Sequence, residues 1–313
     1  MTLRIAHFGL PLAACLLARD GHDVGLSVLA PVDAPGRRRL TRCIGAARIL
    51  DARALGGRLE RAVREALERD PPDLVVSWFW TRRLPAAWLE LAKFGGIGAH
   101  PSLLPRHRGP NPYFAAIDAG DAETGVTIHR LTAEYDEGDI LLTRALAVGE
   151  RDSWQLARAL DRPSLALLRD AARAFASGAP PLAVAQRSEL ATWAPEPIGD
   201  ELRVVWTWPT DRVLRRVRAL APVPGLSLDI EGLELVVTRA TPAAHYPSAL
   251  EPGEAAVFGN PPAVILRTGD GAVALERAVL EGGREEADAV LGRLELAAAV
   301  ADHLARRNPG RLG

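Results

Sequence analysis

Cysteine is nearly absent from this 313-residue chain, in which only Cys15 and Cys43 occur. Two cysteines in a chain of this length cannot form a disulfide framework, and their spacing fits no zinc site. We therefore expect a reducing, cytoplasmic environment and no bound metal.

Long apolar runs are absent as well, since none approaches the roughly 20 residues that a membrane-spanning helix needs. The apolar stretch from Leu10 to Ala18 follows a strand-like segment with only Arg4 ahead of it, which predicts a first helix on a sheet rather than a signal peptide. Excess charge is also lacking, because the formal net charge is −1. This excludes a strong overall attraction to nucleic acid or to an anionic membrane.

A glycine-rich nucleotide motif is missing from the first turn of the chain. Residues 3–8 predict a buried strand, Gly9 a tight turn, and residues 12–19 and 24–29 a helix and the next strand. Gly9 stands alone, without the G-x-G-x-x-G spacing that lets a backbone approach a pyrophosphate. We therefore reject a dinucleotide-binding site.

Alternating strand-like and helix-like segments follow and predict an α/β fold with a doubly wound, mostly parallel sheet. β-branched and apolar runs predict further strands at residues 74–77, 96–100 and 124–129. Periodic apolar positions predict helices at residues 59–67, 84–92, 112–118 and 156–176, the last interrupted near Pro163.

The composition changes beyond residue 177, where Gly and Pro turns separate short strands. The strands are expected at residues 226–230, 233–239, 263–267 and 271–275. Such spacing predicts a small, open, OB-like barrel. We therefore predict a catalytic domain at 1–185, a linker at 186–205 and a C-terminal domain at 206–313.

The stretch from residue 95 to 142 carries the chemistry that the sequence suggests. His100 ends a short buried strand, and the prolines at 101 and 105 hold the following residues extended as a loop. Asp136 comes 36 residues later, in an acidic loop after another strand. We expect His100 and Asp136 to meet at strand carboxyl ends, where sites of open α/β sheets lie.

The order H-x-S-L-L-P-x-x-R-G, T-G-V-T and D-x-G-D-I-L in this stretch resembles the signature of the 10-formyltetrahydrofolate-dependent formyltransferases. The A-T-W-A-P linker and the R-A-x-x-P-x-P-G turn resemble the entry to the C-terminal domain of methionyl-tRNA and sugar formyltransferases. The resemblance implies the formyltransferase fold, with 10-formyltetrahydrofolate as cosubstrate and His100 and Asp136 as catalytic residues. Residues implied to contact the folate are Ser102, Leu103, Leu104, Pro105, Trp80 and Leu84.

One position departs from this pattern. The family motif is Asn-x-His, and Gly98 occupies the position of its Asn. In the family this Asn implies a hydrogen-bond donor to the oxyanion. Asn111 is the nearest amide in sequence and a candidate auxiliary donor. Restoring the amide by Gly98→Asn is expected to raise transfer if the space beside His100 is empty. The other nearby histidines predict no chemistry: His129 is expected to be structural or at the rim, and His107 exposed.

The acceptor is open between two enzymatic interpretations. Residues 201–313 contain 13 arginines, no lysine and 15 acidic residues. This slightly acidic composition does not favour a domain that binds tRNA phosphates. The arginines from Arg212 to Arg218 nevertheless form a basic face. R-G-P-N-P and T-I-H-R resemble the small-amine branches, so a small primary amine, such as an amino sugar, is our first prediction. Methionyl-tRNA is the alternative. The arginine-rich segment 31–45 predicts a solvated turn. A folate-binding homologue with impaired transfer is the third interpretation, because of Gly98.

Overall fold

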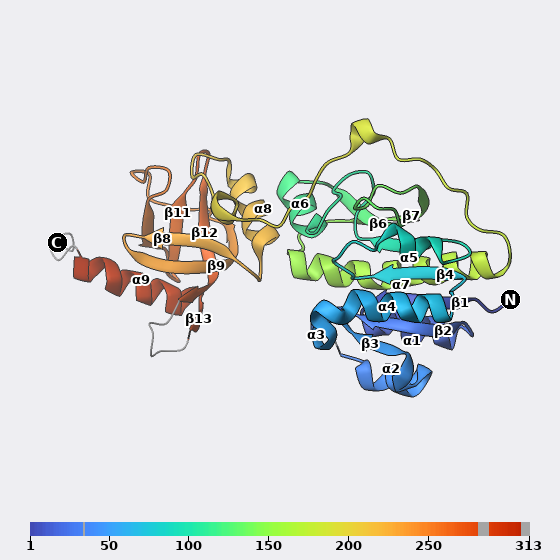
Figure 1. The fold of residues 1–313 in the computed structure, drawn as a ribbon. Coiled ribbons are helices and arrows are strands. Elements are labelled where there is room, and N and C mark those ends of the chain that lie inside the picture. Colours follow the sequence, from blue (N-terminus) through green and yellow to red (C-terminus); the bar gives the residue numbers. More distant parts are fainter. Residues whose placement is uncertain (34, 281–287, 308–313) are drawn as a thin grey trace. The chain divides into compact units, whose positions relative to one another are not determined.

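The structure is a computed structural model that describes residues 1–33, 35–280 and 288–307. The chain folds into two compact units, which are coloured along the sequence in Figure 1. The first unit consists of residues 1–112, 123–147 and 158–195, and the second of residues 113–122, 148–157 and 196–313. Two short segments of the second unit, residues 113–122 and 148–157, therefore interrupt the first unit along the sequence, and the domain boundaries stay a prediction.

A seven-stranded sheet forms the centre of the first unit, in the order β3-β2-β1-β4-β5-β6-β7. Its strands are β1 (Arg4–Gly9), β2 (Asp23–Leu29), β3 (Ile49–Asp51), β4 (Leu74–Trp78), β5 (Gly96–His100), β6 (Glu123–Arg130) and β7 (Ile140–Ala147). The first five strands in the chain pair in parallel, and β6 and β7 add to the edge in antiparallel fashion. The predicted doubly wound, mostly parallel sheet is confirmed.

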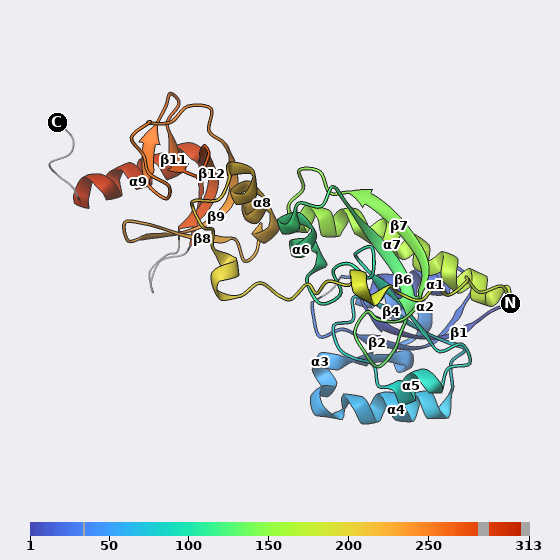
Figure 2. The same cartoon turned by 90° about the horizontal axis from the view of Figure 1, so that it is seen from above.

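Helices cover both faces of this sheet, and Figure 2 shows α4 and α5 on one side and α7 on the other. Apolar side chains of α4 and α5, including Val63 and Trp88, pack with those of β1, β2 and β4 in one buried cluster. Besides α7, the helices of this unit are α1 (Pro11–Arg19), α2 (Arg37–Ile44), α3 (Ala52–Leu55), α4 (Leu59–Arg69) and α5 (Ala86–Glu90). The predicted arginine-rich turn is in fact helical at α2, because its buried Leu40 gives this short segment an apolar side.

The long helix α7 (Ser153–Ala176) continues through Pro163, so the interruption predicted there is wrong. Its side chains join it to the sheet: Ser164 Oγ accepts a hydrogen bond from Trp78 Nε1 at 2.9 Å, and Phe175 packs on Phe94 with ring centroids 5.6 Å apart. α6 (Pro112–Ala119) lies where the sequence predicts a helix. Among the described residues no helix has the length and apolar character needed to cross a bilayer.

The second unit contains an antiparallel sheet in the order β10-β11-β12-β9-β8, with β13 paired to β12. Its elements are α8 (Thr210–Leu220), β8 (Leu226–Ile230), β9 (Leu233–Pro242), β10 (Ala255–Phe258), β11 (Ala263–Arg267), β12 (Ala272–Leu280), β13 (Ala289–Gly292) and α9 (Arg293–Arg307). This antiparallel half-barrel matches the predicted β-rich C-terminal domain. The strands β10 and β13 and the helix α9 were not predicted.

Candidate active site

His100 is the last residue of β5, and its imidazole is held on both nitrogen atoms. Nδ1 lies 3.4 Å from Asp136 Oδ2, and Nε2 lies 2.7 Å from the backbone oxygen of His107. The side chain is only 7 % exposed. Because a carbonyl oxygen only accepts, the Nε2 atom carries hydrogen, and Nδ1 is the atom presented to the carboxylate.

Asp136 reaches this histidine by a route that the sequence did not predict. β6 runs antiparallel to β5, so its carboxyl end lies beside Ile97 at the start of β5, and the expectation of two neighbouring carboxyl ends is wrong. The loop after β6 instead folds back along the strand. Gln186 Nε2 anchors this loop by donating to the backbone oxygens of Asp136 and Gly138, each at 2.7 Å.

The backbone of Asp136 itself is unusual, with φ of +56°. Left-handed backbone costs free energy for residues other than glycine, and Asp tolerates it better than most. Its Oδ2 atom accepts the Gly109 N–H at 2.9 Å, which fixes the carboxylate beside the His100 ring. The predicted pair is therefore brought together by a strained, anchored loop.

His129 is a member of this cluster and is only 4 % exposed, so the expected rim position is wrong, whereas the expected structural role stays a prediction. Its Nε2 atom lies 3.6 Å from Asp136 Oδ1, and its ring centroid lies 6.5 Å from that of His100. Each carboxylate oxygen of Asp136 thus faces one histidine. The register of the antiparallel pair β5–β6 places His129 directly opposite Gly98, and nothing in the sequence alone marks this pairing.

The prediction of an exposed His107 is wrong, because the residue is 5 % exposed. Its backbone N–H donates to Thr192 Oγ1 at 2.8 Å while its carbonyl accepts from His100. The segment around Thr192 pairs with this loop: Arg108 N–H donates to Thr192 O, and Ala194 N–H to Arg108 O. The predicted linker therefore supports the loop behind His100, next to the predicted catalytic pair.

The loop proposed to contact folate is packed closely against β6. Ser102 is fully buried and donates to Arg106 O at 2.6 Å, and Thr127 Oγ1 accepts the Leu104 N–H at 3.1 Å. Leu104 is 6 % exposed, whereas Leu103 and Pro105 are partly exposed. The loop is thus rigidly placed beside His100, and its contact with folate stays a prediction.

The other predicted folate residues belong largely to the core. Leu84 is buried in the cluster of α4 and α5, and Trp80 packs edge-on against Phe8 with centroids 5.5 Å apart. The Nε1 atom of Trp80 is nevertheless buried without a hydrogen-bond acceptor among the described residues. Asn111 donates its backbone N–H to Ala194 O at 3.0 Å, and an auxiliary role for its side chain stays a prediction.

The space next to Gly98 is occupied. A Cβ atom on residue 98 would lie 2.8 Å from Leu131 Cδ2 and 3.3 Å from His129 Nε2. Any side chain at this position would therefore press on both residues. The glycine at 98 therefore leaves His129 and Leu131 in their observed positions, from which a side chain would shift them.

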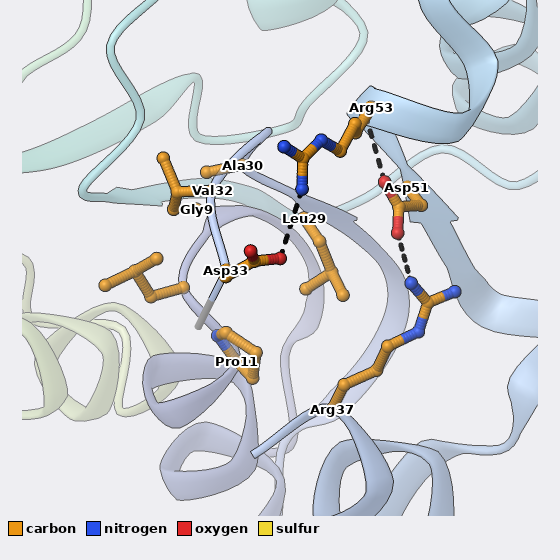
Figure 3. A pocket seen from close by; sticks show the side chains of 10 residues that line it. Gly9, Pro11, Leu29, Ala30, Val32, Asp33, Arg37, Asp51 and Arg53 are labelled. Atoms are coloured by element: carbon orange, nitrogen blue, oxygen red, sulfur yellow. Dashed lines mark hydrogen bonds and ion pairs between the residues drawn. The ribbon is translucent and has the colours of Figure 1, made fainter. Parts of the chain in front are cut away.

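A cavity of about 100 Å³ lies at the carboxyl ends of β1, β2 and β3 (Figure 3). Arg53 donates to Asp33 at 3.1 Å and Arg37 pairs with Asp51, so both cationic side chains at its wall are neutralised. Its lining residues are Gly9, Leu10, Pro11, Leu29, Ala30, Val32, Asp33, Arg37, Asp51 and Arg53. None of the predicted catalytic or folate-contacting residues lines this cavity. Among the described residues no group of three or more side chains is arranged to hold a metal ion.

Comparison with known proteins shows the family to which the chain belongs. Residues 21–163 match the family described as Formyl transferase, and residues 199–290 match Formyl transferase, C-terminal domain. A methionyl-tRNA formyltransferase of Anaeromyxobacter dehalogenans is 35 % identical over 292 residues, which cover 90 % of this chain and 93 % of the relative. The chain belongs to the formyltransferase family. The predicted enzyme class and family are confirmed.

Solved structures agree with this formyltransferase in fold. HypX from Aquifex aeolicus in complex with tetrahydrofolic acid has a TM-score of 0.65 at 22 % identity and covers 98 % of this chain and 48 % of HypX. The N-formyltransferase from Helicobacter canadensis, in complex with folinic acid and dTDP-3-aminofucose, has a TM-score of 0.65 at 13 % identity and covers 88 % and 99 %.

Proposed function

We propose that this formyltransferase transfers the formyl group of 10-formyltetrahydrofolate to the amine of methionyl-tRNA. The observation that carries the proposal is the 3.4 Å approach of His100 Nδ1 to Asp136 Oδ2, in a buried cluster beside the Ser102–Pro105 loop. A buried imidazole next to a carboxylate has the geometry of a general acid–base pair.

The proposed reaction is an acyl transfer. The amine nitrogen bonds to the formyl carbon, and the carbonyl electron pair moves to oxygen. His100 takes the proton that leaves the amine, and the Asp136 carboxylate stabilises the charged ring. The bond from the formyl carbon to N10 then breaks, and N10 receives that proton. The products are the formylated amine and tetrahydrofolate.

The site offers groups that fit a folate. Trp80 Nε1 is a buried donor without an acceptor among the described residues, and a pterin carbonyl would supply one. The partly exposed Leu103 and Pro105 present apolar surface on a rigid loop. We propose these residues as its contacts, together with the packed Ser102, Leu104 and Leu84 behind them.

Two observations support methionyl-tRNA as the acceptor. The first is the family relationship to methionyl-tRNA formyltransferases over nearly the whole chain. The second is α2, whose residues Arg38, Arg39 and Arg42 are exposed next to the cavity wall at Arg37. The cavity and His100 share one edge of the sheet, and β1 and β5 are two strands apart, which is about 10 Å.

Aminoacylated tRNA is a cytoplasmic substrate, so the cytoplasm is the proposed location of the protein.

A small primary amine is the second candidate, because the basic face of α8 is engaged within its own unit. Arg212 and Arg216 both bind Asp118, Arg215 pairs with Asp211, and Arg218 donates to Gly149 O at 2.8 Å. These arginines are not available as a phosphate-binding row. With 13 arginines against 15 acidic residues, the C-terminal part of the chain gives little support to tRNA binding.

The test is to incubate the enzyme with 10-formyltetrahydrofolate and either methionyl-tRNA or a panel of amino sugars, and to identify the products by mass spectrometry. Formyl-methionyl-tRNA is expected, with a rate that falls steeply with salt. Replacing Arg38 and Arg42 by Glu should reduce the salt slope by about one unit for each phosphate that is no longer bound. Arg64→Glu on the exposed side of α4 is the matched control.

Transfer only to an amino sugar would establish the second candidate instead. Saturable folate binding without transfer to any amine would identify a homologue that has lost this activity. If no folate binds at millimolar concentration, the assignment of 10-formyltetrahydrofolate as the cosubstrate is wrong.

A further inference from the structure

His129 lies where a side chain of residue 98 would project. Gly98 and His129 are directly opposite in the antiparallel pair β5–β6, and a Cβ on residue 98 would lie 3.3 Å from Nε2 and 3.7 Å from Cε1 of the imidazole. The absence of a side chain at Gly98 thus leaves the ring uncrowded in its place beside Asp136.

The hydrogen bonds of His129 define which of its nitrogen atoms can accept. Nδ1 lies 2.9 Å from the backbone oxygen of Arg130, which only accepts, so the hydrogen of the neutral ring is on Nδ1. Burial lowers the pKa of His129 to about 4; the nearby His100 and Arg108 act in the same direction, while Asp136 opposes the shift. At neutral pH the ring is therefore neutral, and Nε2 presents a lone pair.

Two acceptors consequently face each other in the cluster. Nε2 of His129 and Oδ1 of Asp136 are 3.6 Å apart, which is too long for a hydrogen bond, and neither atom brings a hydrogen. The other carboxylate oxygen already accepts the Gly109 N–H. A nitrogen atom with two N–H groups can satisfy both acceptors at once, whereas a hydroxyl has only one hydrogen.

We propose that His129 is a third functional residue of this site, whose Nε2 atom accepts an N–H of the attacking amine while Asp136 Oδ1 accepts another. This role rests on the proposed function and deepens it. His129 orients the nitrogen lone pair toward the formyl carbon, and the site prefers primary amines to alcohols. His100 remains the residue that takes the proton.

Substitutions at 129 separate the nitrogen atom from the shape of the ring. His129→Phe removes the acceptor and keeps an aromatic ring, and should lower kcat/KM for the amine by about 10- to 100-fold with a raised KM. His129→Gln supplies an amide oxygen and should recover much of the loss. His7→Gln, at another buried histidine on a strand of the same sheet, is the control and should leave the KM for the amine unchanged.

Folate affinity is measured in parallel by calorimetry and should be equal in all variants. A wild-type kcat/KM in His129→Phe would overturn the inference. Equal losses of kcat/KM in His129→Phe and His129→Gln would also overturn it, as would losses of kcat/KM that follow folate affinity. Each of these results indicates that His129 has only a packing role.

Nitrogen NMR of the histidine rings tests the inference without turnover. With tetrahydrofolate bound, His129 should show hydrogen on Nδ1, and its Nε2 resonance should move as methylamine is added, while that of His7 stays in place. Hydrogen on Nε2, or no response, would overturn the inference. If these signals appear but no amine is formylated, the proposed function fails and the amine site stands.

Discussion

Two mostly buried carboxylates, one in each unit, each lie between two basic side chains, and their geometries differ. Asp136 faces two imidazoles at 3.4 and 3.6 Å, from a residue with left-handed backbone. Asp118 binds Arg216 through both oxygens, at 2.6 and 3.0 Å, and Arg212 at 3.0 Å. Arg216 also stacks on Phe114 and Trp208 and donates to two backbone oxygens.

The difference indicates which cluster is suited to proton transfer and which cluster stabilises the fold. Guanidinium groups keep their protons and bind a carboxylate in a fixed bidentate geometry, so the cluster of Asp118 joins α8 to α6. An imidazole nitrogen can donate or accept a proton, unlike a guanidinium, and contacts longer than a hydrogen bond leave room for a donor from the substrate. We therefore expect changes at Asp136 to affect activity and changes at Asp118 to affect stability.

The largest effect is expected from Asp136→Asn. The amide oxygen can still accept the Gly109 N–H, but the negative charge that stabilises a protonated His100 is lost. We expect kcat to fall by about 10²- to 10⁴-fold with a change in unfolding free energy below about 1 kcal/mol. Single-turnover transfer rates and denaturant unfolding measure the two quantities. A variant that unfolds readily but retains its rate would place Asp136 with the structural cluster.

The next effect is expected from Asp118→Asn, which leaves Arg216, 8 % exposed, without its carboxylate. Breaking a buried ion pair in this way costs about 3–5 kcal/mol. Hydrogen exchange of the α8 amides reports this loss locally. Glu150→Gln is the control, because Glu150 is 93 % exposed and pairs with Arg218 at 3.6 Å, and should change stability by less than about 1 kcal/mol. Unchanged protection of α8 in Asp118→Asn would contradict the structural role.

The sequence predicted one of these two clusters in part and the other not at all. His100 and Asp136 could be found because a strand, an extended loop and an acidic loop follow each other within one segment of 48 residues. The pairing of Asp118 with Arg216 spans 98 positions, and nothing local in either segment marks the partner. The sequence therefore described the arginines of α8 as a basic surface, although two of them are anchored on Asp118.

The position of His129 beside Asp136 was not predicted for a different physical reason. Alternation along β6 places His129 on one face of the sheet, but only the antiparallel register with β5 sets it opposite Gly98. The sequence predicted neither the direction of β6 nor the return of the Asp136 loop. The strands and helices themselves were mostly predicted, because apolar periodicity and proline or glycine boundaries are local signals.

The smallest effect is expected from Gly98→Asn, and the structure reverses the result expected for an empty space. The added Cβ must displace Leu131 Cδ2 from 2.8 Å and crowd His129 Nε2, so we expect kcat/KM to fall about three- to tenfold, with about 1–2 kcal/mol lost in stability. In the His129→Ala background the ring is gone, and the same Asn can offer its amide oxygen to the amine. There the substitution should raise kcat/KM, so the two changes should be strongly non-additive in a double-mutant cycle. Gly98→Ala in both backgrounds separates crowding from the amide. If the Gly98→Asn single variant were faster than the wild type, His129 would leave enough space for a side chain at 98. His129 would then not be the group that binds the amine at this position.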